Sequence, residues 1–153
     1  TLHTNTAAGA VVRMQDMGVE SYLITSSVNG VLAQRLVRTL CPHCKTPDQP
    51  SGELLARTGL GRFLGEGKPI YQAVGCGQCR NTGYQGRTGI HELLVLDEPL
   101  RRAVIDGKDA TILHGLAAKS GMLSLYEDGL RKVAAGITSL DELLRVTQDQ
   151  NDG

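Results

Sequence analysis

The chain has few aromatic residues and no excess of charge of either sign. Only 3% of its 153 residues are aromatic, with no tryptophan and a single phenylalanine, so any core must be aliphatic. Its 16 basic residues balance 16 acidic ones, and no block of like charge stands out. A general nucleic-acid-binding protein needs a basic stripe or aromatic stacking surfaces, so we expect no nucleic-acid partner.

Long apolar runs and common catalytic motifs are also missing. No apolar run approaches the ~18–20 residues needed to cross a bilayer, and nothing resembling a signal peptide precedes the cysteines. The chain has no G-x-x-x-x-G-K-[ST] loop that could hold phosphates, and no Ser–His–Asp arrangement can be argued. We therefore expect a protein of the reducing cytoplasm that does not hydrolyse ATP by itself.

The sequence does contain two Cys-x-x-Cys pairs, separated by 31 residues, and no other cysteine. A two-residue gap lets both sulfurs of a pair face one tetrahedral metal, and four thiolates leave no open position for water. We predict that Cys41, Cys44, Cys76 and Cys79 bind one structural zinc ion. Iron in a rubredoxin-like site, two disulfides and free thiols are the alternatives. His43, between two ligands, is expected to point outward.

The stretch between the cysteine pairs is small and rich in loop residues. Residues 45–69 hold three prolines around a weak helical patch at Glu53–Leu60. Structural zinc is worth ~10–16 kcal/mol in finger peptides, whereas a typical domain has a net stability of only ~5–15 kcal/mol. Metal can therefore decide whether this insert folds. We expect Cys44→Ser to unfold residues 41–79 and to leave the terminal helices largely intact.

Apolar periodicity and capping residues predict the other elements. His91 and His114 are expected to be structural. The sequence predicts helices at 7–18 and 20–34 and strands at 35–40, 70–74 and 90–96. Further helices are predicted from Asp97 to Gly107, at 110–119 with Asp109 as cap, at 125–135, and from Leu140, where Ser139 and Glu142 form a capping box. Residues 148–153 are predicted to be a disordered tail.

The first residues indicate a piece of a longer protein. The run Thr1-Leu2-His3-Thr4-Asn5 has no initiator methionine and is typical of a strand that leads into a loop.

Several segments, in order, resemble the C-terminal part of the bacterial type II secretion traffic ATPase and its relatives that assemble type IV pili. Residues 1–6 are similar to the histidine box of that family, and residues 33–41 to the strand that enters its four-cysteine metal domain. Residues 83–93 are similar to the exit from that domain, and residues 128–133 and 136–144 to its terminal helices. The resemblance spans roughly residues 1–147.

The resemblance implies an α/β fold in four segments. Residues 1–40 would be the end of a RecA-like ATPase core, 41–79 a tetracysteine zinc-binding domain, 80–147 a return strand with a C-terminal helical subdomain, and 148–153 the tail.

The resemblance also implies an activity. The whole protein would be a homohexameric motor that hydrolyses ATP with Mg²⁺ at the cytoplasmic face of the bacterial inner membrane, contacts the inner-membrane platform proteins of the secretion system and drives pseudopilus assembly. The Walker A and B motifs would lie upstream of this chain. His3 could sense or position the γ-phosphate, and Arg35 could act at the phosphates or at a subunit interface. The alternative for Arg35 is a solvated strand arginine.

Other functions remain open at this point. A type IV pilus assembly ATPase would have the same motifs, because the cysteine insert does not separate the two systems. A free-standing zinc module that binds nucleic acid or protein is a second alternative. A thiol–disulfide enzyme is a third, although two cysteine pairs separated by a loop fit it poorly.

Overall fold

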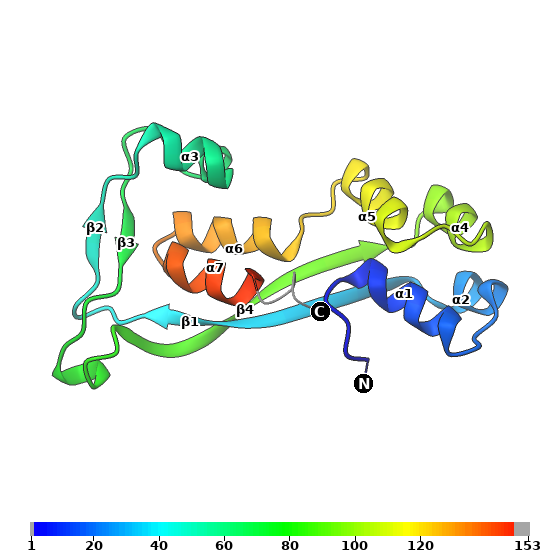
Figure 1. Cartoon of the computed structure of the whole chain (residues 1–153), viewed down its shortest axis with the longest axis horizontal. Coiled ribbons are helices and arrows are strands. Elements are labelled where there is room, and N and C mark those ends of the chain that lie inside the picture. Colours follow the sequence, from blue (N-terminus) through cyan, green and yellow to red (C-terminus); the bar gives the residue numbers. More distant parts are fainter. Residues whose placement is uncertain (1, 149–153) are drawn as a thin grey trace. The chain divides into compact units, whose positions relative to one another are not determined.

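The computed structural model describes residues 2–148, which form two compact units of mixed α/β structure (Figure 1). Unit 1 comprises the described residues up to Gln34 and residues 91–125, and unit 2 comprises residues 35–90 and the described residues from Tyr126 on. The mixed α/β class is therefore confirmed. The four-segment division and the RecA-like assignment remain predictions.

Three elements continue from one unit into the other. They are β1 (Gly30–Leu40), β4 (Tyr84–Val95) and α6 (Leu125–Ala134). The two strands form a two-stranded sheet. They run antiparallel, because Leu96 N donates to Asn29 O at one end of the ladder and Cys41 N donates to Gly83 O at the other.

Unit 1 packs four helices around an aliphatic core. The helices are α1 (Ala7–Asp16), α2 (Ser21–Ser27), α4 (Glu98–Ile105) and α5 (Ala110–Lys119). The expected caps of the last two are present, since the side chains of Asp97 and Asp109 accept from Leu100 N and Ile112 N. The core cluster contains no aromatic residue, as the composition predicts; it consists of Ala7, Ala8, Val11, Ile24, Leu94, Leu96, Leu100, Ala103, Val104, Leu113 and Ala117.

Unit 2 contains the cysteines and the last helix. Its remaining elements are β2 (Thr46–Asp48), α3 (Gly52–Thr58), the 3₁₀ helix η1 (Leu60–Arg62), β3 (Ile70–Gln72), the 3₁₀ helix η2 (Gly77–Cys79) and α7 (Leu140–Gln148). Strands β2 and β3 form a two-stranded antiparallel sheet in which Pro47 pairs with Tyr71. The Tyr126 hydroxyl of α6 donates to Thr58 O at 2.7 Å, which fastens α3 to α6.

A buried carboxyl group joins β1 to α7 within unit 2. Glu142 is 1% exposed and accepts from the Arg38 guanidinium at 2.8 Å and from the Arg145 guanidinium at 2.7 Å. Burial alone raises the pKa of Glu142, but the hydrogen bonds from Arg145 and Arg38 outweigh it and lower this pKa to about 2. Only half of the expected capping box is present: Ser139 Oγ accepts from Glu142 N at 3.1 Å, while the carboxyl group bonds to the two arginines.

Three element boundaries differ from the sequence prediction by more than two residues. The helix expected at 20–34 is wrong beyond Ser27, because Gly30 begins β1 and lies against the backbone of β4. The strand expected at 90–96 begins six residues earlier, at Tyr84, since residues 84–89 pair with the end of β1. Both errors have one cause: cross-strand pairing is not visible in local sequence.

The two ends of the chain also differ from expectation. No strand is present at residues 2–5, although the sequence predicted one at 1–5. Gln148 is the last residue of α7 rather than part of a disordered tail, and residues 149–153 lie outside the described residues. Within residues 2–148 no helix is long and apolar enough to cross a membrane.

Candidate metal centre

The structure brings the four cysteines of unit 2 into one cluster. Cys41 directly follows β1, and Cys44 ends the turn after it. Cys76 is the N-cap of η2, and Cys79 is the last residue of that 3₁₀ helix. Their four Sγ atoms all lie within 4.8 Å of one another. Two chain segments separated by 31 residues thus converge on one point, as the sequence predicts for a single site.

The distances between the sulfurs fit a tetrahedral metal. Three Sγ–Sγ pairs are separated by 3.8 Å: Cys41–Cys76, Cys44–Cys79 and Cys76–Cys79. Zinc–thiolate bonds of ~2.3 Å at tetrahedral angles place sulfurs ~3.8 Å apart. A disulfide needs ~2.05 Å, and all four thiols are free. The four sulfurs therefore fit a metal ion bound by four thiolates, and they do not form the two disulfides named above as an alternative.

Backbone N–H groups point at two of the sulfurs. Gly75 N donates to Cys44 Sγ at 3.3 Å, whereas Cys76 N and Gly83 N each donate to Cys79 Sγ at 3.2 Å. Such donors stabilise thiolates, which are the form that binds metal. Gly83 is required here, because its φ is +81° and an added Cβ would lie 2.6 Å from Ala73 Cβ.

Cys44 and Cys79 differ in pKa, and one reason is that one backbone N–H donates to Cys44 Sγ whereas two donate to Cys79 Sγ. Burial raises the pKa of Cys44 to about 11, against the opposing effect of one donor at Gly75. Burial also acts to raise the pKa of Cys79, but the N–H groups of Cys76 and Gly83 outweigh it and lower this pKa to about 6. Four clustered sulfurs without a cation cannot all be thiolates at once, which is why a divalent ion suits the site.

The base of the cysteine cluster is fastened to the α6–α7 turn, which we define as residues 135–139. Four consecutive residues of this turn each bond to a different residue near the cysteines. Leu40 and Lys45 directly flank the first cysteine pair, and Tyr84 directly follows Gly83, whose N–H donates to Cys79 Sγ. The contacts are Lys45 Nζ to Gly136 O (2.9 Å), Leu40 N to Ile137 O (2.9 Å), Thr138 Oγ1 to Arg38 O (2.7 Å) and Tyr84 OH with Ser139 Oγ (2.6 Å).

The sequence did not reveal these contacts. Lys45 Nζ also lies 4.5 Å from the centroid of the Tyr71 ring, so the Lys45 ammonium group contacts both the β2–β3 sheet and the α6–α7 turn. Gly136 has φ +75°, and an added Cβ would lie 3.0 Å from the same ring. The only hint in the sequence was that a glycine follows the predicted helix at 125–135.

The other candidate residues stay apart from the cysteine cluster. His43 is exposed, as expected. Within residues 2–148, the group of side chains close enough together to bind one metal ion consists of the four cysteines and does not include His43. His114 belongs to α5 of unit 1 and is half-buried. His3 is an exposed residue of unit 1, and Arg35 is a half-buried residue of unit 2. Nothing in either unit tests their predicted phosphate roles.

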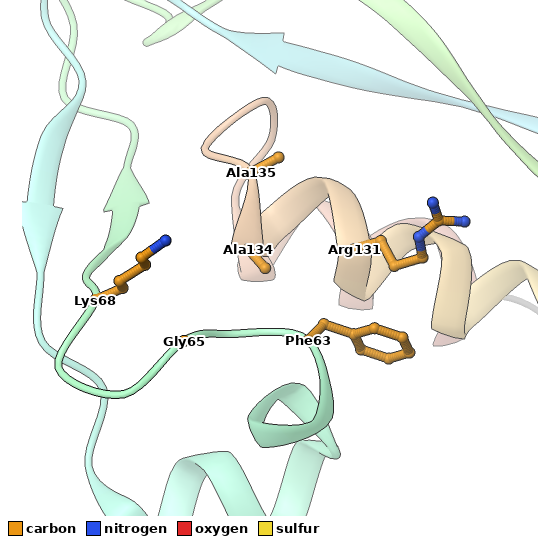
Figure 2. A pocket seen from close by; sticks show the side chains of 6 residues that line it. All are labelled: Phe63, Gly65, Lys68, Arg131, Ala134 and Ala135. Carbon is orange, nitrogen blue, oxygen red and sulfur yellow. The ribbon is translucent and has the colours of Figure 1, made fainter.

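A hollow of about 290 Å³ lies between the loop after η1 and α6 in unit 2 (Figure 2). The Lys68 side chain extends toward the last turn of α6, where helix carbonyl groups attract a cation. Arg131 also lines the hollow, but its guanidinium pairs with Asp128 at 3.5 Å. With Glu66 exposed in the same loop, the local charges are close to balanced, so we assign no ligand to this hollow.

The fold and the four sulfurs define a mixed α/β protein with a tetrathiolate geometry suited to a structural metal ion. Residues 1–145 match the family described as type II/IV secretion system protein, and the chain belongs to this family.

Individual relatives support the same assignment. The chain is 50% identical over 151 residues to the type II secretion system ATPase E of Vibrio cholerae. This match covers 97% of the chain and 29% of that protein. It is 49% identical over 149 residues to the type II secretion system protein E of Aeromonas hydrophila, with 97% and 29% covered. It is 48% identical over 147 residues to the type IV pilus assembly ATPase PilB of Thermus thermophilus, with 96% and 16% covered. The chain thus spans less than a third of the length of these curated relatives.

Proposed function

We propose that this chain is the C-terminal part of a cytoplasmic, homohexameric ATPase that powers type II protein secretion by driving pseudopilus assembly. The observation that carries the proposal is the family match over residues 1–145 combined with four sulfurs at tetrahedral spacing. The type II secretion system ATPase E of Vibrio cholerae and the type II secretion system protein E of Aeromonas hydrophila are identical to this chain at about half of the aligned positions, over nearly its whole length.

In this proposal the four cysteines hold a structural zinc ion. The ion supplies a rigid tetrahedral crosslink and no chemistry toward ATP, because four thiolates leave no position for water or phosphate. The residues of the chain itself transmit that rigidity, since Lys45 and Tyr84 connect the cysteine segments to the α6–α7 turn. The centre is therefore architectural.

ATP and Mg²⁺ would be bound by the Walker A and B motifs of the longer protein, which the 153 residues of this chain do not contain. His3 would sense or position the γ-phosphate, and Arg35 would act at the phosphates or at a subunit interface of the assembled hexamer. The partners would be neighbouring subunits and the inner-membrane platform proteins of the secretion system, with the motor peripheral at the bacterial inner membrane.

Type IV pilus assembly is the second candidate function. It is favoured by the 48% identity to PilB, which hardly differs from the 49–50% identity to the secretion proteins. Sequence identity therefore does not separate the two systems.

A segment exchange tests the proposal. This chain replaces the matching segment of the Vibrio cholerae ATPase, to which it is 50% identical. We expect the chimera to form hexamers, hydrolyse ATP and restore secretion in a strain that lacks the native ATPase. The matched control is the same chimera with Cys41→Ser and Cys44→Ser. A zinc-loaded hexamer without ATPase activity would contradict the proposal, and rescue confined to a parallel PilB chimera would favour pilus assembly.

A further inference from the structure

A second buried carboxyl group, in unit 1, lies outside the metal centre. Glu92 is 1% exposed and occupies an inward position of β4, between Ile90 and Leu94, which are both buried. An apolar residue would be expected at such a position. A buried acid instead needs specific partners, because leaving its oxygens without hydrogen bonds is costly.

The partners of Glu92 are the first N–H groups of two different helices. Oε1 accepts from Ala7 N, the first residue of α1, at 2.9 Å. Oε2 accepts from Leu125 N, the first residue of α6, at 3.2 Å. Helix N-termini carry partial positive charge and N–H groups that lack helical partners, so one carboxyl group satisfies both helix starts. His114 Nδ1 lies 4.0 Å from Oε1.

The helix start that Glu92 holds is tied to the segment containing His3. Thr6 caps α1 by accepting from Gly9 N at 2.9 Å, and Thr4 Oγ1 donates to Thr6 O at 3.2 Å. Residues 4–6 therefore form a hydrogen-bonded turn on the end of α1. Since Ala7 follows this turn directly, a shift of Ala7 also shifts His3.

We propose that Glu92 is the positioning residue of the His3 segment and couples it to the start of α6. Glu92 touches no reacting atom in this scheme; it sets where His3 lies when ATP is bound. The proposal rests on the proposed function for the role of His3, whereas the holding of α1 and α6 by Glu92 is independent of that function.

The first test is amide hydrogen exchange on this chain. In Glu92→Gln the side-chain NH₂ can face one of the two helix N–H donors, so one hydrogen bond is lost. We expect the amides of Ala7 and Leu125 to exchange about fivefold faster or more. The matched control is Glu98→Gln, an exposed acid of α4 paired with Arg102, which should leave both amides unchanged. Unchanged exchange in Glu92→Gln would overturn the proposal.

The second test is steady-state ATPase kinetics in the longer protein or in the Vibrio cholerae chimera. We expect Glu92→Gln to lower kcat about 10- to 100-fold with little change in KM, because displaced catalytic groups impair the chemical step. The kcat of the double variant His3→Ala/Glu92→Gln should fall no further than that of His3→Ala alone, because both changes remove the same contribution, that of a correctly placed His3. Losses that multiply in the double variant would show that Glu92 does not act through His3.

Glu92→Asp keeps the proposal testable if Glu92→Gln does not fold. Aspartate keeps the acid but is one methylene shorter, so it should give an intermediate kcat and the same non-additivity with His3→Ala. An inactive chimera whose Ala7 and Leu125 amides respond as expected would refute the proposed function and leave the structural role of Glu92 standing. An active chimera with normal kcat in both Glu92 variants would refute the positioning role.

Discussion

Removal of metal from the cysteine cluster should loosen the α6–α7 turn as well as the insert that contains the cysteines. The sequence by itself predicted loss of structure only within residues 41–79. The structure extends that expectation. Lys45 directly follows Cys44 and bonds to Gly136, and Tyr84, which bonds to Ser139, directly follows Gly83, whose N–H donates to Cys79 Sγ. When the cysteine segments become disordered, both anchors lose their fixed positions.

The size of the effect follows from those two contacts. Each hydrogen bond contributes on the order of 1 kcal/mol net, so losing both costs the turn about 2 kcal/mol. About 1.4 kcal/mol corresponds to a factor of ten, and amides of the α6–α7 turn should then exchange about 30-fold faster. The turn should not unfold entirely, since Ile137 and Thr138 remain bonded to β1.

Hydrogen exchange with mass spectrometry measures this directly. The zinc-loaded chain is compared with Cys44→Ser, and with the same chain after chelation, over peptides that cover residues 130–140. His43→Ser is the matched control, because it changes an exposed residue inside the same cysteine pair. Helix α5 of unit 1 should be unaffected in all samples. Faster exchange confined to residues 41–79 would refute the reasoning and restore the picture of an autonomous insert.

Four further outcomes are expected. Elemental analysis should find one zinc ion per chain, and a metal-free protein with an ordered insert would contradict the assignment. Because the folded-state pKa of Glu142 is about 2 against a usual 4.5, its stabilisation of about 3 kcal/mol should be complete above pH 4.5 and lost as the pH falls toward 2; acid titration of Glu142→Gln should lack that transition. Gly129→Ala should lower the free energy of unfolding by about 1–3 kcal/mol, because an added Cβ would lie 2.1 Å from Leu143 Cδ1 in the buried contact of α6 with α7; an unchanged denaturation midpoint would contradict this. The chain alone should not hydrolyse ATP, whereas His3→Ala and Arg35→Ala in the longer protein should each reduce turnover about 10²–10³-fold, and near-normal rates would assign both residues structural roles.

Local signals in the sequence were enough for the helices with clear caps. Asp97 and Asp109 each cap the helix that follows them, and the predicted ranges agree with α4 and α5 to within two residues. Caps act between residues three positions apart, so they can be read without knowledge of the fold. The pairing of two Cys-x-x-Cys segments was predictable for a similar reason, because the spacing within each pair already defines how two sulfurs face one metal.

The tertiary structure decided the features that depend on distant partners. Residues 30–34 have enough apolar side chains for a helix, yet they pair with β4 and form the start of β1. Glu142 matched a local capping box, but its carboxyl group bonds to Arg38, 104 residues away in the chain. Glu92 and Lys45 show no local pattern, since their hydrogen-bond partners lie more than 30 residues away in the chain. Sequence patterns specify interactions within one turn or one strand, whereas pairing and buried charge depend on which segments the whole chain brings together.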